Sequence, residues 1–132
     1  MSRRSNALAW LCVAAALACP AEVLAETVTV ARALDKVTAR VTELALPQDQ
    51  PVRFGTLQIV ARHCEKTPPT EPPETFAFVQ IDDMRAEGDD QRVFSGWMFA
   101  SSPSLSALEH PVYDVWVIDC RVSEPGQGEG SE

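Results

Sequence analysis

The sequence predicts an all-β protein, a small antiparallel β-sandwich or partly open barrel of about seven strands. Three observations lead to this fold class. Short runs rich in valine, threonine and aromatic residues recur along the chain, and these residue types pack well on a pleated sheet. Proline and glycine clusters separate the runs, as turns separate strands. After the first 25 residues, no segment reads as a continuous helix of ordinary length.

Residues 1–25 resemble a cleaved N-terminal signal peptide. Arg3 and Arg4 give a basic start, an apolar run occupies residues 7–18, and Val23-Leu24-Ala25 matches the small-x-small pattern that signal peptidase cleaves. The apolar run is too short to cross a bilayer as a helix, which needs about 20 apolar residues. We therefore expect a periplasmic protein with no stable membrane insertion after cleavage.

Lipidation at Cys19 is the alternative use of this segment. The preceding Ala16-Leu17-Ala18 resembles a lipobox only loosely, so we favour cleavage after Ala25. Cleavage there leaves a single β domain over residues 26–122, a length that supports one hydrophobic core. Residues 123–132 are rich in glycine and glutamate and are predicted to form a disordered acidic tail.

Residues 27–46 carry two competing patterns. The segment is rich in branched valine and threonine, which favour a sheet. Its apolar residues, however, also have the spacing of an amphipathic helix. Apolar residues recur at steps of four and three: Val30, Leu34, Val37, Val41 and Leu44. We predict strands near residues 28–34 and 39–45 with a turn around Asp35-Lys36. The alternative is an amphipathic helix across residues 31–44.

The middle of the chain alternates short strands and turns. A polar turn over residues 47–51 leads into a short strand over residues 52–54, which Gly55 ends. Leu57, Ile59 and Ala61 alternate with Gln58, Val60 and Arg62, as the two faces of a half-buried strand do. Residues 67–74 include four prolines, which lack an amide donor, so this segment is predicted to be a stiff surface connector.

The C-terminal half is predicted to contain a hairpin and a last strand. The hairpin joins residues 76–84 and 92–100 through a charged turn at residues 86–90, and the last strand covers residues 113–120. The loop over residues 101–111 is long enough for one helical turn. That turn would have Ser102 as N-cap, Pro103 at the first helical position, and Leu105 and Leu108 facing inward.

The aromatic strand over residues 92–100 allows two interpretations. Trp97 and Phe99 share one of its faces, while Phe94 and Met98 share the other. We favour a central strand that is covered on both faces. The alternative is an exposed binding face, because aromatic residues and methionine are enriched where proteins contact partners. The candidate binding residues are Trp97, Phe99, Tyr113 and Trp116.

Cys64 and Cys120 are the cysteines that remain after signal cleavage. In an oxidising compartment, two such residues in a small domain most often form a structural disulfide. Unbroken strand alternation places Cys64 on the face of Gln58 and Arg62, and Cys120 on the face of Trp116 and Ile118. We therefore expect the bond just beyond the regular sheet, near an edge.

Candidates for catalysis or metal binding are few. The weak catalytic candidates are His110, Glu109 and Asp114, but no known catalytic motif surrounds them, and a structural histidine is the favoured interpretation. A metal site of the two mature cysteines with His63 or His110 lacks the close ligand spacing of zinc sites. We therefore predict no catalytic residues, no metal and no cofactor.

Several strings of residues resemble the exported alphaproteobacterial family known as domain of unknown function 2155. They are Leu34-Asp35-Lys36-Val37-Thr38, Phe54-Gly55-Thr56-Leu57, Cys64 with its proline-rich continuation, and the segments over residues 94–102 and 109–114. The resemblance covers residues 30–120 and implies a secreted envelope protein, without an activity to carry over. Ala39 departs from the pattern, because a glycine is more usual at this position.

The acidic composition narrows the choice of partner. The chain has 11 Lys and Arg against 19 Asp and Glu, a formal net charge of −8 at pH 7, whereas nucleic acids and anionic lipids require clustered positive charge. We expect an exported cell-envelope protein that acts as a non-catalytic protein-binding or scaffold module for another envelope protein. The alternative is a small envelope hydrolase that uses the His110 loop.

Overall fold

The computed structural model describes residues 25–85 and 88–123 of the 132-residue chain. These residues form eight strands and no helix, hence none that could cross a membrane. The strands are β1 (Glu26–Asp35), β2 (Arg40–Pro47), β3 (Val52–Phe54), β4 (Leu57–Lys66), β5 (Thr75–Asp83), β6 (Gln91–Phe99), β7 (Leu108–Glu109) and β8 (Tyr113–Ser123). The all-β prediction is confirmed. The predicted signal peptide up to residue 24, turn residues 86–87 and tail residues 124–132 lie outside the described residues.

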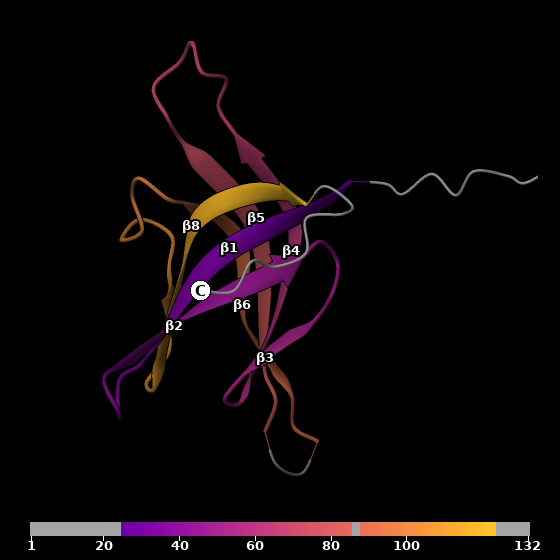
Figure 1. The fold of residues 1–132 in the computed structure, drawn as a ribbon. Helices are drawn as coiled ribbons and strands as arrows, with labels where there is room; N and C mark the ends of the chain where they lie inside the picture. The colour runs from indigo at the N-terminus through magenta and orange to yellow at the C-terminus, as the bar shows by residue number, and fades with distance from the viewer. Residues whose placement is uncertain (1–24, 86–87, 124–132) are drawn as a thin grey trace, which may run out of the picture.

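The strands form two antiparallel sheets rather than a closed barrel. One has the order β2-β1-β8-β7 and the other the order β3-β4-β5-β6. Figure 1 shows β8 lying beside β1, so the first and last strands of the described chain are neighbours. Strands β1 and β8 contact β4 and β5 of the other sheet. Of the two predicted architectures, the sandwich is therefore the one that the chain adopts.

The core lies between the sheets and is built from the inward positions of each strand. Along β5, every second residue is buried from Thr75 to Asp83, which is the period of a strand with one face on the core. The core cluster consists of Ala31, Ala33, Leu46, Leu57, Ile59, Ala61, Ala77, Val79, Ile81, Met98, Leu108, Val115 and Val117. Its members come from both sheets, so the apolar interior is continuous between them.

The hairpin of β1 and β2 confirms the two-strand prediction for this region and excludes the helix. Its turn is held by Asp35, whose Oδ1 accepts hydrogen bonds from the amides of Val37 (2.9 Å) and Thr38 (3.2 Å). Ala39 ends the turn at a φ of 57°, in the left-handed region that favours glycine. Branched residues therefore formed strands despite their helical spacing, because the pairing of β1 with β2 and β8 requires extended backbone.

A one-residue β-bulge reverses the alternation of β4 ahead of Cys64. The register with β5 shifts between Ala61 and His63, so Arg62 is an extra residue without a partner. Ala61 faces the core before the bulge, and Cys64 packs against the core after it. Without the extra residue, Cys64 would point to the outer side of the sheet.

A second bulge does the same in β8. Val30 of β1 pairs with Asp119 and the next residue pairs with Val117, so Ile118 is the extra residue. Val117 is buried in the core before the bulge, and Cys120 is buried after it. Each cysteine therefore follows a bulge that turns it inward from one of the two sheets.

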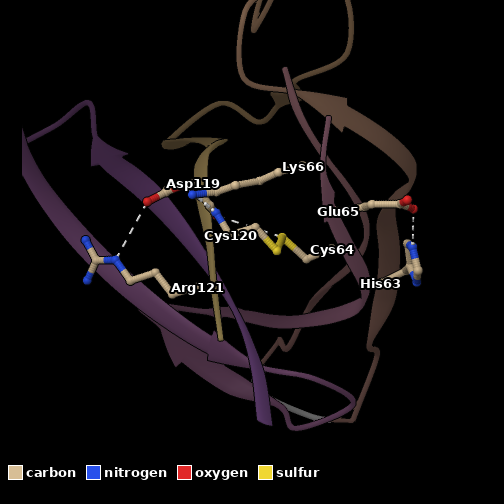
Figure 2. Close-up of a disulfide and its surroundings, with 7 residues drawn as sticks. All are labelled: His63, Cys64, Glu65, Lys66, Asp119, Cys120 and Arg121. Atoms are coloured by element: carbon tan, nitrogen blue, oxygen red, sulfur yellow. Dashed lines mark hydrogen bonds and ion pairs between the residues drawn. A yellow bond between two sulfur atoms is a disulfide. The ribbon is translucent and has the colours of Figure 1, made fainter. Parts of the chain in front are cut away.

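The disulfide between Cys64 and Cys120 joins the two sheets, with Cα atoms 5.9 Å apart (Figure 2). The expected position beyond the regular sheet is wrong, because that expectation assumed unbroken alternation and the bulges invert it. Both cysteines lie within paired strands. The expected proximity to an edge is correct. β3 pairs with β4 only over residues 57–59 and β7 pairs with β8 only over residues 114–115, so β4 and β8 are the edge strands where the cysteines lie.

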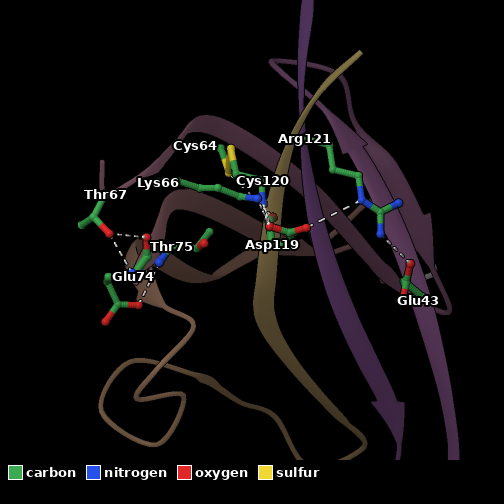
Figure 3. Close-up of polar contacts among 9 residues, drawn as sticks. All are labelled: Glu43, Cys64, Lys66, Thr67, Glu74, Thr75, Asp119, Cys120 and Arg121. Atoms are coloured by element: carbon green, nitrogen blue, oxygen red, sulfur yellow. Dashed lines mark hydrogen bonds and ion pairs between the residues drawn. A yellow bond between two sulfur atoms is a disulfide. The ribbon is translucent and has the colours of Figure 1, made fainter. Parts of the chain in front are cut away.

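An ion pair lies beside the disulfide and also crosses between the sheets. Lys66 of β4 contacts Asp119 of β8 with an Nζ–Oδ1 distance of 2.5 Å, and Arg121 contacts the other oxygen of Asp119 at 3.7 Å (Figure 3). Burial raises the pKa of Asp119, but hydrogen bonds from Lys66 and from the Cys120 amide, together with the charges of Lys66 and Arg121, outweigh it, so that the pKa is lowered overall. Because these side chains are partly exposed, the ion pair adds little to the covalent link.

The proline-rich connector over residues 67–74 is a closed loop. Thr67 donates its amide to the carbonyl of Glu74 (3.0 Å) and its hydroxyl to the carbonyl of Pro72 (2.9 Å). The Glu74 carboxylate in turn accepts the amide (3.1 Å) and the hydroxyl of Ser101, which lower its pKa. The connector is therefore tied to the end of β6.

The loop over residues 101–111 contains no helical turn, contrary to prediction. A single hydrogen bond from the Leu105 amide to the Ser102 carbonyl (3.1 Å) closes one isolated turn, so Ser102 is not a helix N-cap. Leu105 is 81% exposed rather than inward, whereas Leu108 is 1% exposed as predicted. Only Ser106 and Ala107 separate this turn from β7, which leaves no room for a helix.

We predict that protein isolated without reductant has no free thiol at Cys64 or Cys120. The double variant Cys64→Ala/Cys120→Ala should lose about 4 kcal/mol of unfolding free energy, because the bond closes a loop with a sequence separation of 56. Alkylation in denaturant with mass spectrometry measures the thiols, and urea unfolding measures stability. Reductant should leave the double variant unchanged. Two reactive thiols in the unreduced wild type would contradict the pairing.

We also predict that Ala39→Gly stabilises the protein by roughly 0.5–1 kcal/mol. A left-handed backbone costs alanine about 1–2 kcal/mol, and the greater chain entropy of unfolded glycine offsets part of the gain. Val37→Gly is the matched control, since Val37 lies in the same turn, is 78% exposed and has no positive φ. It should lower the unfolding free energy. Equal urea midpoints for the two variants would refute the role of the φ angle at Ala39.

Candidate functional site

The outer aromatic face is a group of four rings on the solvent side of the second sheet. Phe76 and Phe78 come from β5, and Trp97 and Phe99 come from β6, which is an edge strand. Trp97 is 42% exposed and Phe99 is 39% exposed, whereas Met98 between them is buried. The favoured prediction of a central strand with both faces covered is therefore wrong, and the alternative of an exposed face describes the structure.

The four rings pack against one another rather than lying flat. Trp97 meets Phe78 at 5.3 Å between ring centroids with an interplanar angle of 75°, and Phe76 at 5.8 Å and 60°. His63 of β4 also approaches Trp97, at 5.8 Å and 77°, while Phe76, Trp97 and Phe99 line a shallow hollow. This edge-to-face geometry suits an aromatic cluster that holds its own shape.

The free edge of β6 is partly capped by the loop that follows it. The carbonyl of Trp97 accepts a hydrogen bond from the Ser106 hydroxyl, and the carbonyl of Phe99 accepts one from the Ser102 amide (3.2 Å). An edge strand with open backbone groups would invite another strand, and covering it with a loop prevents that. The exposed feature here is therefore the face of the sheet more than its edge.

The other two predicted binding residues lie elsewhere. Trp116 is on the outer side of the first sheet, where it lines a groove together with Leu34 and Pro103. Tyr113 begins β8 and packs against Phe54 at 5.5 Å between ring centroids. Only Trp97 and Phe99 of the four candidates are brought together.

Tyr113 also fixes the tight turn between β3 and β4. Gly55 in that turn has a φ of 56°, and a Cβ atom at Gly55 would overlap the Tyr113 hydroxyl. Glycine is thus required there for two reasons, the backbone conformation and the close approach of the phenol. On its other side, the Tyr113 ring stacks on His110 at 5.4 Å and 24°.

His110 pairs with a carboxylate that the sequence did not indicate. Its Nε2 lies 3.2 Å from Oδ2 of Asp83, and its Nδ1 accepts the amide of Val112 at 3.1 Å. Because Nδ1 is an acceptor, Nε2 carries the proton and donates to Asp83. The two side chains are 11% and 8% exposed. The alternation of β5 could have marked Asp83 as a buried position, because it continues the series Ala77, Val79 and Ile81, but the sequence does not name its partner.

The predicted neighbours of His110 do not assemble with it. The Asp114 carboxylate pairs with Lys36 at 2.9 Å, and the same Nζ donates to the backbone carbonyl of His110 at 2.8 Å. Glu109 is exposed and is the register partner of Asp114. Both ring nitrogens of His110 are therefore engaged within the protein, where their contacts hold loops together.

The Asp83 carboxyl is held in its charged form. The hydroxyl of Thr56 lowers its pKa most, burial opposes this, and His110 and Arg85 lower it further. These partners come from the β3–β4 turn, the segment before β8 and the end of β5. In the described part of the chain, no cluster of three or more His, Cys, Asp or Glu is placed to hold a metal ion.

We predict that Asp83→Asn lowers the unfolding free energy at pH 7 by about 1–3 kcal/mol, the cost of breaking a buried hydrogen-bonded group. A lowered pKa in the folded state means that the charged carboxyl stabilises the fold above its unfolded pKa of about 3.9, and that this contribution is lost as the pH falls below it. Urea unfolding from pH 7 to pH 3 should show a shallower decline in the variant. Asp89→Asn, an exposed turn residue, is the control. Parallel pH profiles for Asp83→Asn and wild type would contradict this role.

Comparisons with known proteins identify the family of the chain. A family model described as an uncharacterised protein conserved in bacteria (DUF2155) matches residues 29–120. An uncharacterised protein of Rickettsia prowazekii (strain Madrid E) is 33% identical over 88 residues, which is 67% of this chain and 57% of the relative. The chain thus spans little more than half of that relative's length. No solved structure matches. The resemblance noted in the sequence is confirmed, and the chain belongs to the uncharacterised bacterial family DUF2155.

Proposed function

We propose that this protein is an exported cell-envelope protein, a non-catalytic binding or scaffold module that holds another envelope protein on its outer aromatic face. The observation that carries the proposal is the exposure of Trp97 (42%) and Phe99 (39%) on a sheet face that is not part of the core. Exposed aromatic groups of this kind are the usual anchors of protein interfaces.

The ring geometry supports a protein partner over a glycan. A sugar ring stacks on a flat aromatic surface, but Trp97 stands at 60° to Phe76 and at 75° to Phe78. Apolar side chains can enter the shallow hollow between Phe76, Trp97 and Phe99 without a flat surface. The capped edge of β6 likewise supports contact through side chains over addition of a partner strand.

Export is supported by two features that are independent of the aromatic face. The first 25 residues have the basic start, apolar run and cleavage pattern of a signal peptide. The Cys64–Cys120 disulfide fits an oxidising compartment. The net charge of −8 speaks against nucleic acid and anionic lipid as partners. The alternative of a hydrolase has less support, because both ring nitrogens of His110 are occupied.

We predict that a photo-reactive amino acid at Phe99 crosslinks to one envelope protein in living cells, whereas the same amino acid at Val41 does not. Val41 is 53% exposed on the first sheet and is therefore a matched control for exposure. Trp97→Ala should weaken capture from position 99 at least about tenfold, as expected for an interface anchor. Mass spectrometry identifies the crosslinked protein, and circular dichroism verifies that the variant is folded.

Two outcomes would overturn the proposal. One is capture that is unaffected by Trp97→Ala in a folded variant. The other is no capture from position 99 together with turnover of an envelope substrate that His110→Gln abolishes. The second result would establish the hydrolase instead.

A further inference from the structure

A hollow of about 340 Å³ opens at the end of the sandwich opposite the disulfide. The β1–β2 hairpin, the β3–β4 turn and the start of β8 surround it. Its lining includes Asp35, Thr38, Arg40, Thr42, Phe54 and Tyr113. The hollow is distinct from the outer aromatic face, so a ligand bound in it is independent of the proposed function.

Two opposite charges line this hollow without neutralising each other. Asp35 and Arg40 are register partners at the mouth of the β1–β2 hairpin, yet they form no ion pair within 4.0 Å. Oδ1 of Asp35 is committed to the turn amides, which leaves Oδ2 as an acceptor. Within the described ranges the Arg40 guanidinium makes no hydrogen bond or ion pair, so it is available to a ligand.

A fixed hydroxyl group faces the same hollow. The Tyr113 ring is held between Phe54 and His110, and its hydroxyl lies against Gly55. Within residues 25–85 and 88–123 that hydroxyl makes no hydrogen bond. Because the buried Asp83 holds His110 in turn, the phenol is rigid and presents an unused donor to the hollow.

We propose that this hollow binds a small zwitterion, namely an α-amino acid with an apolar side chain. The planar guanidinium of Arg40 suits the carboxylate, which can also accept the Tyr113 hydroxyl. The remaining carboxylate oxygen of Asp35 suits the ammonium group. The rings of Phe54 and Tyr113 offer the apolar surface for the side chain. A ligand with only one of the two charges leaves either Asp35 or Arg40 without a partner.

The test uses L-leucine as the probe, with N-acetyl-L-leucine and L-leucinamide as analogues that each lack one charge. Nuclear magnetic resonance titration of the nitrogen-15-labelled protein should show saturable shifts at the amides of Thr38, Arg40, Gly55 and Tyr113 with leucine. Each analogue should bind about tenfold more weakly, since each loses one charge-assisted contact.

Variants of this chain assign the contacts. Arg40→Gln should weaken leucine binding about tenfold, and Tyr113→Phe, which removes only the hydroxyl, about threefold. Arg32→Gln is the control, because Arg32 is exposed on β1 and does not line the hollow. The absence of any saturable shift with leucine would overturn the proposal. Binding of either analogue as tightly as leucine would also overturn it, because the site would then suit a simple anion or cation. Equal effects of Arg40→Gln and Arg32→Gln on leucine binding would overturn it as well.

Discussion

The two β-bulges at Arg62 and Ile118 are the constraint on which this sandwich depends. Each inserts one residue into a strand and turns the next cysteine from the outer side to the interior. The core between the sheets contains several of the smallest apolar side chains: Ala31, Ala33, Ala61 and Ala77. A core of this kind in a domain of about 100 residues buries limited apolar area, so a covalent link between the sheets contributes a large share of the stability.

The opposite end of the sandwich is held by polar and aromatic contacts instead of a covalent bond. Tyr113 is the first residue of β8 and Cys120 lies near its end, while Cys64 lies near the end of β4 that is far from the β3–β4 turn, so the disulfide and the Tyr113 contacts lie at opposite ends. At the Tyr113 end, His110 joins its own loop to two other segments. Its ring contacts Asp83 at the end of β5, and its backbone carbonyl accepts a hydrogen bond from Lys36 of the β1–β2 turn. These contacts order the hairpin and turn that frame the polar hollow, because each loop there is anchored by a specific partner.

The sequence predicted those features that depend on the type of one residue or on a local pattern. It did not predict the features that depend on which residues the fold brings into contact. Alternating and branched residues predicted all the longer strands, and the expectation of an oxidising compartment predicted the cysteine pair. A bulge leaves no mark in composition, since Arg62 and Ile118 are ordinary strand residues. The position of β6 was missed because apolar side chains on both faces favour a covered central strand, whereas β6 lies at the edge of its sheet. His110 could not be matched with Asp83, because only the fold brings residues 27 apart in sequence into contact.

The fold does not require aromatic side chains on the outer side of the second sheet, because other outward positions of the same strand are polar. Along the outward positions of β5, Phe76 and Phe78 are followed by Gln80 and Asp82, so one strand carries both an aromatic and a polar half. The polar half is satisfied internally, for Asp82 pairs with Arg92 at 2.7 Å. The same strand geometry therefore accommodates polar side chains at its outward positions. The rings cover one another in part, which stabilises the cluster, yet they leave Trp97 and Phe99 substantially in water. Polar groups there would avoid the cost of hydrating apolar surface, which supports the proposal that another molecule covers the aromatic half.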